Sequence, residues 1–330
     1  MKNFVLSREV PMLVEARARK KGFIPILEVL IFFAVLIAAS SVQSIPTAIV
    51  TAAHMLKAGA LDPAFINEAQ TLLSNGDLTG YFEHVMSLLQ WLPSWITLVN
   101  LFATVLTTIV VILFCRVIQK RRYTSLGLGL KRAVPEYLLG TVLGIAMISA
   151  AALLGAAFGA IKLSFAKFNV GLFLLFMLGY FFQGMSEEVL CRGYLMVSIT
   201  RRNNVWRAVF VSSLVFSLLH IMNPGFGILP FINILLCGAV FGIYAIKRNS
   251  LWGACAMHSF WNFFQGNFFG ISVSGTGAGA NASVMQAETL EANKLLTGGT
   301  FGIEGSIATT IVMAAALLLV IFVLPQRKKA

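Results

Sequence analysis

Long apolar stretches, separated by shorter polar segments, run through most of the chain. They do not alternate strictly between apolar and polar residues, so they predict helices rather than half-buried strands. A helix needs roughly 20 apolar residues to cross a hydrocarbon layer about 30 Å thick. The pattern therefore predicts about eight membrane-spanning helices, at residues 23–45, 91–115, 134–160, 170–195, 205–222, 226–246, 250–270 and 306–324.

The composition agrees with a chain that lies mostly in lipid. Of its 330 residues, 58% are hydrophobic and 12% are charged, whereas a soluble domain carries about 25% charged residues. Backbone polar groups must be paired within lipid, which restricts spanning segments to helices or a closed barrel. Continuous apolar runs favour helices, and we expect an all-α, polytopic transmembrane helical bundle.

The basic residues separate cleanly between the two sides of this bundle. With the N-terminus inside, 20 of the 25 Lys and Arg residues lie on the inner side, four lie outside, and Arg192 lies within the membrane. Cytoplasmic loops are enriched in Lys and Arg, so we expect a multi-pass protein of the cell membrane with both termini in the cytoplasm. This topology explains the net charge of +12 without a nucleic acid partner.

Three regions follow from the arrangement of spans and loops. Residues 1–165 hold the N-terminal spans, the basic N-terminus and an outer loop, 46–90, in which we expect short helices. Residues 166–270 form a core that contains the polar residues discussed next. Residues 271–330 comprise an outer loop rich in Gly and Ser, followed by the last spanning helix.

Few ionisable residues lie within the predicted spans. An ionisable side chain in a membrane is costly unless it is paired or hydrated, and such residues usually mark function. The fourth span carries three of them, the fifth and seventh carry one histidine each, and an asparagine shares the seventh: Glu187, Glu188, Arg192, His220, His258 and Asn262.

Helical spacing suggests roles for these residues. Glu188 and Arg192 are four residues apart and share a helix face, so they can form an ion pair. Glu187 is rotated by about 100° from its neighbour and lacks that partner, which leaves it available as a general base. His258 and Asn262 also share a face and can offer two hydrogen-bond donors to a developing oxyanion.

The predicted depths of these residues support one shared site. Counting about 1.5 Å per residue from the cytoplasmic helix ends places Glu187, His220, His258 and Asn262 about 14 to 24 Å into the membrane. The helices run in alternating directions, so their polar groups could have fallen at opposite faces. We expect them to meet in the membrane interior.

The three segments resemble a known family in both motif and order. EEVLCR, FSLLH and HSFWN are similar to the EExxxR, FxxxH and HxxxN motifs of the CAAX prenyl protease and bacteriocin-processing family of intramembrane proteases, over roughly residues 170–265. The resemblance implies hydrolysis of a peptide bond in a membrane-associated or prenylated, CAAX-type substrate. It implies that Glu187 with His220 activates water, that His258 with Asn262 stabilises the tetrahedral intermediate, and that Glu188 and Arg192 support them.

A metal mechanism stays open at this point, because the family has also been described as metalloproteases. Glu187, His220 and His258 could hold a zinc ion with an open position for water. The sequence lacks the HExxH pattern of a zincin helix. We therefore favour a glutamate-activated water that requires no cofactor.

Other functions would use similar residues. A proton- or ion-coupled transporter also places carboxylates and histidines within the membrane, and a non-catalytic bacteriocin immunity or scaffold protein could keep the same fold. The two histidines could also be structural groups that join helices, and Glu187 a buried structural acid. Membrane lipids and a peptide substrate are the partners we expect, whereas the sequence does not predict an oligomeric state.

Overall fold

The computed structural model confirms an all-α membrane bundle. It describes residues 6–19, 21–57, 62–90, 95–277, 282–289 and 294–327. Within these residues, helices occupy all eight predicted positions: α2 (Pro25–Lys57), α5 (Trp95–Val117), α6 (Ala133–Ala157), α7 (Val170–Glu188), α9 (Val205–Leu218), α10 (Ile228–Arg248), α11 (Trp252–Phe263) and α13 (Ile307–Leu318).

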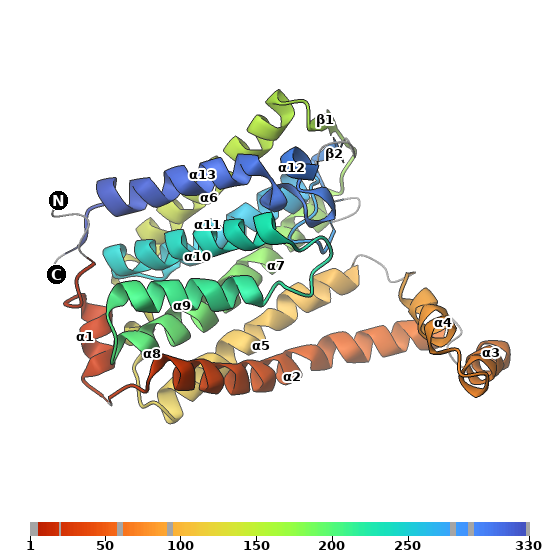
Figure 1. The fold of residues 1–330 in the computed structure, drawn as a ribbon, viewed down its shortest axis with the longest axis horizontal. Coiled ribbons are helices and arrows are strands. Elements are labelled where there is room, and N and C mark those ends of the chain that lie inside the picture. Colours follow the sequence, from red (N-terminus) through yellow and green to blue (C-terminus); the bar gives the residue numbers. More distant parts are fainter. Residues whose placement is uncertain are drawn as a thin grey trace.

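Five of the helical segments are long and apolar enough to cross a membrane, namely those at 25–57, 95–117, 130–157, 170–200 and 228–248. Helix α7 reaches residue 200 because it continues through a π-helical stretch, Val189–Met196, into α8 (Val197–Thr200). The helices α9, α11 and α13 are shorter. Figure 1 shows the helices of the bundle side by side, with α1 (Pro11–Arg17) and the C-terminal end of α13 at the same end of the molecule.

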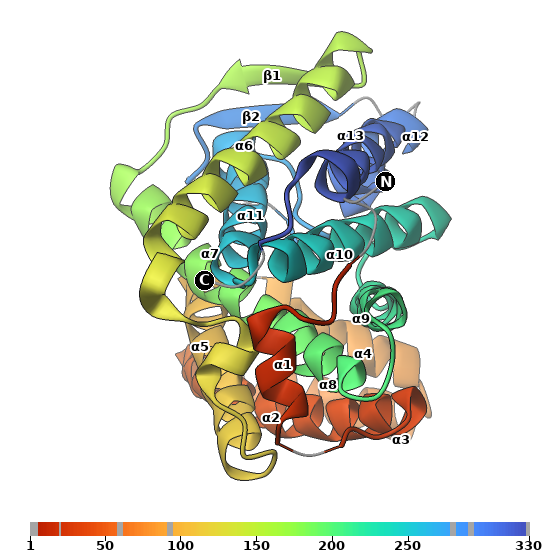
Figure 2. The ribbon, with the colours of Figure 1, turned by 90° about the vertical axis from the view of Figure 1, so that its left-hand side faces the viewer.

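Helix α11 lies inside the bundle, where it packs against α6, α7 and α10. The view in Figure 2 shows it surrounded by these neighbours. Its contact with α6 depends on two glycines one turn apart, Gly140 and Gly144, which face the backbone of Gly253 and Met257. Small residues at this spacing let two membrane helices approach closely.

Replacing Gly144 by Ala is expected to destabilise the fold. The new Cβ would lie 2.5 Å from the carbonyl oxygen of Met257, so α6 and α11 must separate, at a cost of roughly 1–3 kcal/mol. The thermal unfolding midpoint in detergent should fall. Val142→Ala changes a side chain of the same helix that is 63% exposed, and an equal shift in that variant would contradict the proposed close packing.

The first spanning helix is longer than the sequence analysis predicts. We placed its end at residue 45, but α2 continues through Pro46 to Lys57. The residues after Pro46 are mostly helix formers, and one proline removes a single backbone hydrogen bond, so the helix persists. The expected short helices of the outer loop are present as α3 (Pro63–Ser74) and α4 (Leu78–Gln90).

The predicted Gly- and Ser-rich loop contains regular structure that the sequence analysis missed. Strand β2 (Met285–Thr289) pairs antiparallel with β1 (Ile161–Phe165), so that Ile161 lies opposite Thr289. A short helix, α12 (Lys294–Thr297), follows. These elements cover one end of the bundle (Figure 1), opposite the end that holds α1 (Pro11–Arg17).

Candidate active site

A cavity of about 290 Å³ lies among the helices. Residues of α2, α5, α7, α9, α10, α11 and α13 line it, together with the loops that follow α9 and α11. The four residues that we proposed to act chemically all contribute to its wall: Glu187, His220, His258 and Asn262. The structure therefore brings together side chains from three separate segments of the sequence.

The predicted ion pair between Glu188 and Arg192 is present and fully buried. Arg192 donates from Nη1 to Glu188 Oε1 at 2.9 Å, and neither side chain is exposed. The guanidinium also lies over the ring of Phe216, 4.1 Å from its centroid. The helix is π-helical from Val189 onward, so Glu188 and Arg192 lie at the junction between the α-helical and the π-helical segment. π-Helical turns within α-helices are frequent at functional sites.

Glu188 has a second partner that helical spacing alone could not predict. His258 donates from Nδ1 to Glu188 Oε1 at 3.0 Å. A carboxylate only accepts hydrogen bonds, so the Nδ1 atom must carry the proton. Nε2 of His258 is thus the nitrogen left for chemistry. It can accept a proton, and it can donate a hydrogen bond only when the ring is an imidazolium.

Glu187 is partly exposed to the cavity, in contrast to its buried neighbour. Its Oε1 accepts a hydrogen bond of 2.6 Å from Gln183 Nε2. Its Oε2 is 3.7 Å from His258 Nε2 and has no hydrogen-bond partner among the described residues. A carboxylate oxygen without a partner, on a side chain that lines a cavity, is a suitable acceptor for a proton of water.

Gln183 connects two of the candidate residues, and the sequence analysis missed it. It donates to Glu187 and, through Oε1, accepts a hydrogen bond of 3.0 Å from Asn262 Nδ2. One of the two amide hydrogens of Asn262 is thereby used, and the other remains available. Gln183 lies one helical turn before Glu187, and both line the cavity. This four-residue spacing could have identified Gln183 from the sequence.

Changing Gln183 should reduce turnover in a manner that depends on pH. Gln183→Leu removes both hydrogen bonds, and we expect kcat to fall about 10- to 100-fold with little change in KM. Gln183→Glu keeps the acceptor for Asn262 but donates to Glu187 only when its own carboxyl is protonated. Its kcat should therefore recover toward low pH, and a profile of kcat against pH measures this. Parallel profiles for the two variants would contradict the bridging role.

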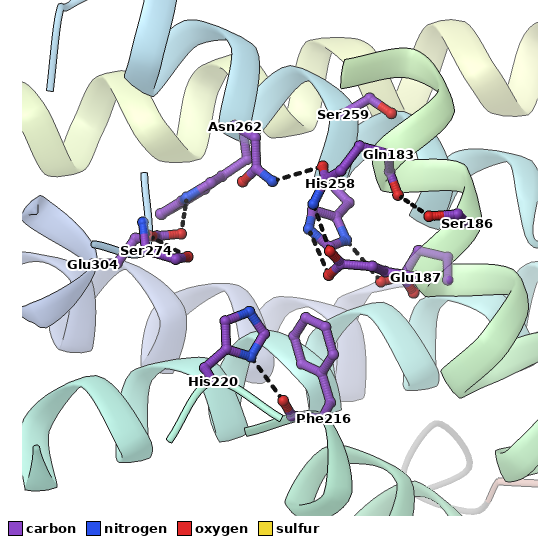
Figure 3. Close-up of polar contacts among 12 residues, drawn as sticks. Gln183, Ser186, Glu187, Phe216, His220, His258, Ser259, Asn262, Ser274 and Glu304 are labelled. Atoms are coloured by element: carbon purple, nitrogen blue, oxygen red, sulfur yellow. Dashed lines mark hydrogen bonds and ion pairs between the residues drawn. The ribbon is translucent and has the colours of Figure 1, made fainter. Parts of the chain in front are cut away.

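His220 lies outside the helix on which we placed it. Helix α9 ends at Leu218, and His220 belongs to the turn that follows. Its Nδ1 donates to the carbonyl oxygen of Phe216 at 2.9 Å, and its ring meets that of Phe216 edge to face. Nε2 is left as an acceptor. In Figure 3, His220 lies across from the Glu187–His258 pair, and the histidine nearest to Glu187 is His258. The joint activation of water by Glu187 and His220 stays a prediction.

A second carboxylate, Glu304, also lines the cavity and was missed. It accepts hydrogen bonds from Trp261 Nε1 (3.1 Å) and from the backbone N–H and hydroxyl of Ser274 (2.6 and 2.8 Å). These bonds hold the loop after α11 against α11 itself (Figure 3). Glu304 could have been recognised in the sequence as an acidic residue directly before the apolar run of the last span.

The three residues suggested as zinc ligands fit a metal site only in part. Each histidine directs its Nδ1 proton to an oxygen acceptor, of Glu188 or of Phe216, which suits a metal-binding imidazole. However, no group of three or more His, Cys, Asp and Glu side chains within the described part of the chain is close enough to hold a metal ion.

Comparison with protein families gives one match. Residues 169–264 match the family model described as type II CAAX prenyl endopeptidase Rce1-like. This segment contains α7, α9, α10 and α11, and with them all four candidate catalytic residues. Comparison with curated proteins finds no match, and comparison with solved structures finds none either.

Proposed function

Since residues 169–264 form a domain of the Rce1-like family of CAAX prenyl endopeptidases, we propose that this membrane protein is an intramembrane endopeptidase. Family membership supports a protease-type hydrolase in general. We further propose that the substrate is a membrane-associated or prenylated, CAAX-type peptide and that a water molecule activated by Glu187 cleaves it. The observation that carries this proposal is the Glu187 side chain on the cavity wall. Its Oε2 atom is buried, has no hydrogen-bond partner among the described residues and lies 3.7 Å from His258 Nε2.

In the proposed reaction, water binds between Glu187 Oε2 and the scissile carbonyl carbon. His220 orients this water by accepting its second hydrogen at Nε2. Glu187 removes a proton, the water oxygen attacks the carbonyl carbon, and the carbonyl oxygen becomes an oxyanion. The free amide hydrogen of Asn262 and the Nε2–H of the His258 imidazolium donate to that oxyanion. Glu187 then passes its proton to the amide nitrogen as the carbon–nitrogen bond breaks.

Glu188 and Arg192 have a positioning role in this proposal. Glu188 holds the Nδ1 proton of His258 and so fixes the ring with Nε2 toward Glu187. Arg192 balances the charge of Glu188 in a fully buried setting. The arrangement resembles the general scheme in which a buried carboxylate orients a catalytic histidine.

The experiment compares the protein termini of cells that carry wild type, Glu187→Gln or Glu9→Gln. Glu9 is a matched carboxylate control, because its side chain is 76% exposed and distant in sequence from the site. Mass spectrometry should find new termini with wild type and Glu9→Gln, and these should be absent with Glu187→Gln. Cleavage of synthetic peptides with and without a prenyl group then separates the two substrate classes. Identical termini in all three strains would refute the proposal.

A further inference from the structure

The wall of the cavity that α2 and α5 form is polar except for Leu101, and it lies outside the family domain at residues 169–264. Helix α5 contributes Thr97, Asn100 and Thr104, which are spaced by three and four residues and therefore share one face. Helix α2 contributes Gln43. Polar side chains in membrane-spanning helices are costly unless they meet partners or water, so this face requires an explanation.

The hydrogen bonds within this wall leave a defined set of donors and acceptors. Gln43 Oε1 accepts from the Thr107 hydroxyl at 2.6 Å, so its two amide hydrogens remain as donors. The Thr104 hydroxyl donates to the Leu101 carbonyl at 2.5 Å, so its oxygen remains as an acceptor. Asn100 is exposed, and its amide offers both a donor and an acceptor.

We propose that this polar wall, made of Gln43, Thr97, Asn100 and Thr104, binds the main chain of an extended substrate peptide. This inference rests on the proposed endopeptidase function. An extended peptide presents N–H and C=O groups, and each needs a partner in a medium of low polarity. Gln43 pairs with a C=O, Thr104 pairs with an N–H, and Asn100 can pair with either.

The dimensions of the wall match a short peptide segment. From Thr97 to Thr104 the helix rises about 10 Å, at about 1.5 Å per residue. An extended chain covers that length with roughly three residues, at about 3.3 Å each. Three residues present enough main-chain groups to occupy the available donors and acceptors. Because the polar wall contacts only main-chain atoms, the recognition tolerates different side chains.

The position of the wall brings such a peptide to the candidate catalytic residues. Helix α5 packs against α7, and Gly179 of α7 allows the close approach of Leu101, because a Cβ there would lie 3.0 Å from the Leu101 Cβ. Two turns beyond Gly179, the same helix carries Glu187. The rest of the lining includes apolar side chains, among them Leu101, Phe176, Ile234 and Met313, which can receive apolar side chains of the peptide.

Kinetics of single variants test this binding face. Asn100→Leu and Thr104→Val, in proteoliposomes with a peptide that wild type cleaves and Glu187→Gln does not, should each raise KM about 3- to 10-fold and leave kcat within about 2-fold. Thr108→Val is the matched control on the same helix, because Thr108 is buried and does not line the cavity. Its KM should equal that of wild type.

Substrates with single N-methylated amides test the same face without a protein variant. Methylation at the amide that pairs with the wall should raise KM for wild type, and Asn100→Leu or Thr104→Val should abolish the difference. An unchanged KM in both variants, or equal effects of methylation in wild type and variants, would overturn the inference while cleavage itself persists. Absence of Glu187-dependent cleavage by wild type would instead refute the proposed function and, with it, this role of the wall.

Discussion

Purified Glu187→Gln protein in proteoliposomes is expected to cleave its substrate about 100- to 10,000-fold more slowly than wild type, because the amide cannot accept the proton of water. The fold should persist. The Gln side chain keeps an oxygen that can accept the hydrogen bond from Gln183, and the position is about one-third exposed, at 31%. Initial rates of cleavage and thermal unfolding in detergent measure the two effects separately.

Glu187→Asp provides the comparison for this experiment. The shorter side chain keeps a carboxylate but moves it back from His258, so its rate should lie between those of wild type and Glu187→Gln. Turnover by Glu187→Gln within a factor of about 3 of wild type would exclude Glu187 as the base. A rate that fell in both variants together with a lower unfolding midpoint would show a structural role instead.

Local patterns in the sequence predict the bundle well, because lipid imposes strong rules on each segment. A helix must be apolar over its length and must satisfy its own backbone, and the helix positions follow from these demands. The ends are less constrained. Helix α2 continues to Lys57 because nothing in the residues after Pro46 stops it.

The candidate site was predictable only where its contacts are local. Glu188 and Arg192 are four residues apart on one helix, so their pairing follows from spacing. The bond from His258 to Glu188 joins residues 70 positions apart, and that from Asn262 to Gln183 joins residues 79 apart. Such contacts depend on how α7 and α11 pack, and local patterns in a single sequence do not predict that packing.

The segment after α11 and the strand that pairs with it show the same limit. Strands β1 and β2 are five residues each and are separated by more than 100 positions, so neither has enough length for a clear alternating pattern. Glu304 acts through partners contributed by α11 and by the loop after it. Its position in the cavity wall depends on how the segment after α11 folds back against the helices, which the sequence does not show.

Glu188→Leu should have the largest effect on stability. It leaves the guanidinium of Arg192 buried without its carboxylate, at a cost of about 3–5 kcal/mol, and it removes the acceptor for His258 Nδ1. We expect a large fall in the thermal unfolding midpoint and loss of cleavage. Loss of both properties in one variant does not separate the two roles of Glu188, so a second substitution is needed.

The double variant Glu188→Leu/Arg192→Leu makes that separation. Replacing a buried ion pair by apolar side chains of similar volume is often neutral, so the unfolding midpoint should return toward that of wild type. Cleavage should stay about 100-fold or more below wild type, because the ring of His258 still lacks its partner and no longer holds Nε2 toward Glu187. Recovery of activity together with stability would show that the pair serves the fold alone. Recovery of stability without activity would assign Glu188 a positioning role in the reaction.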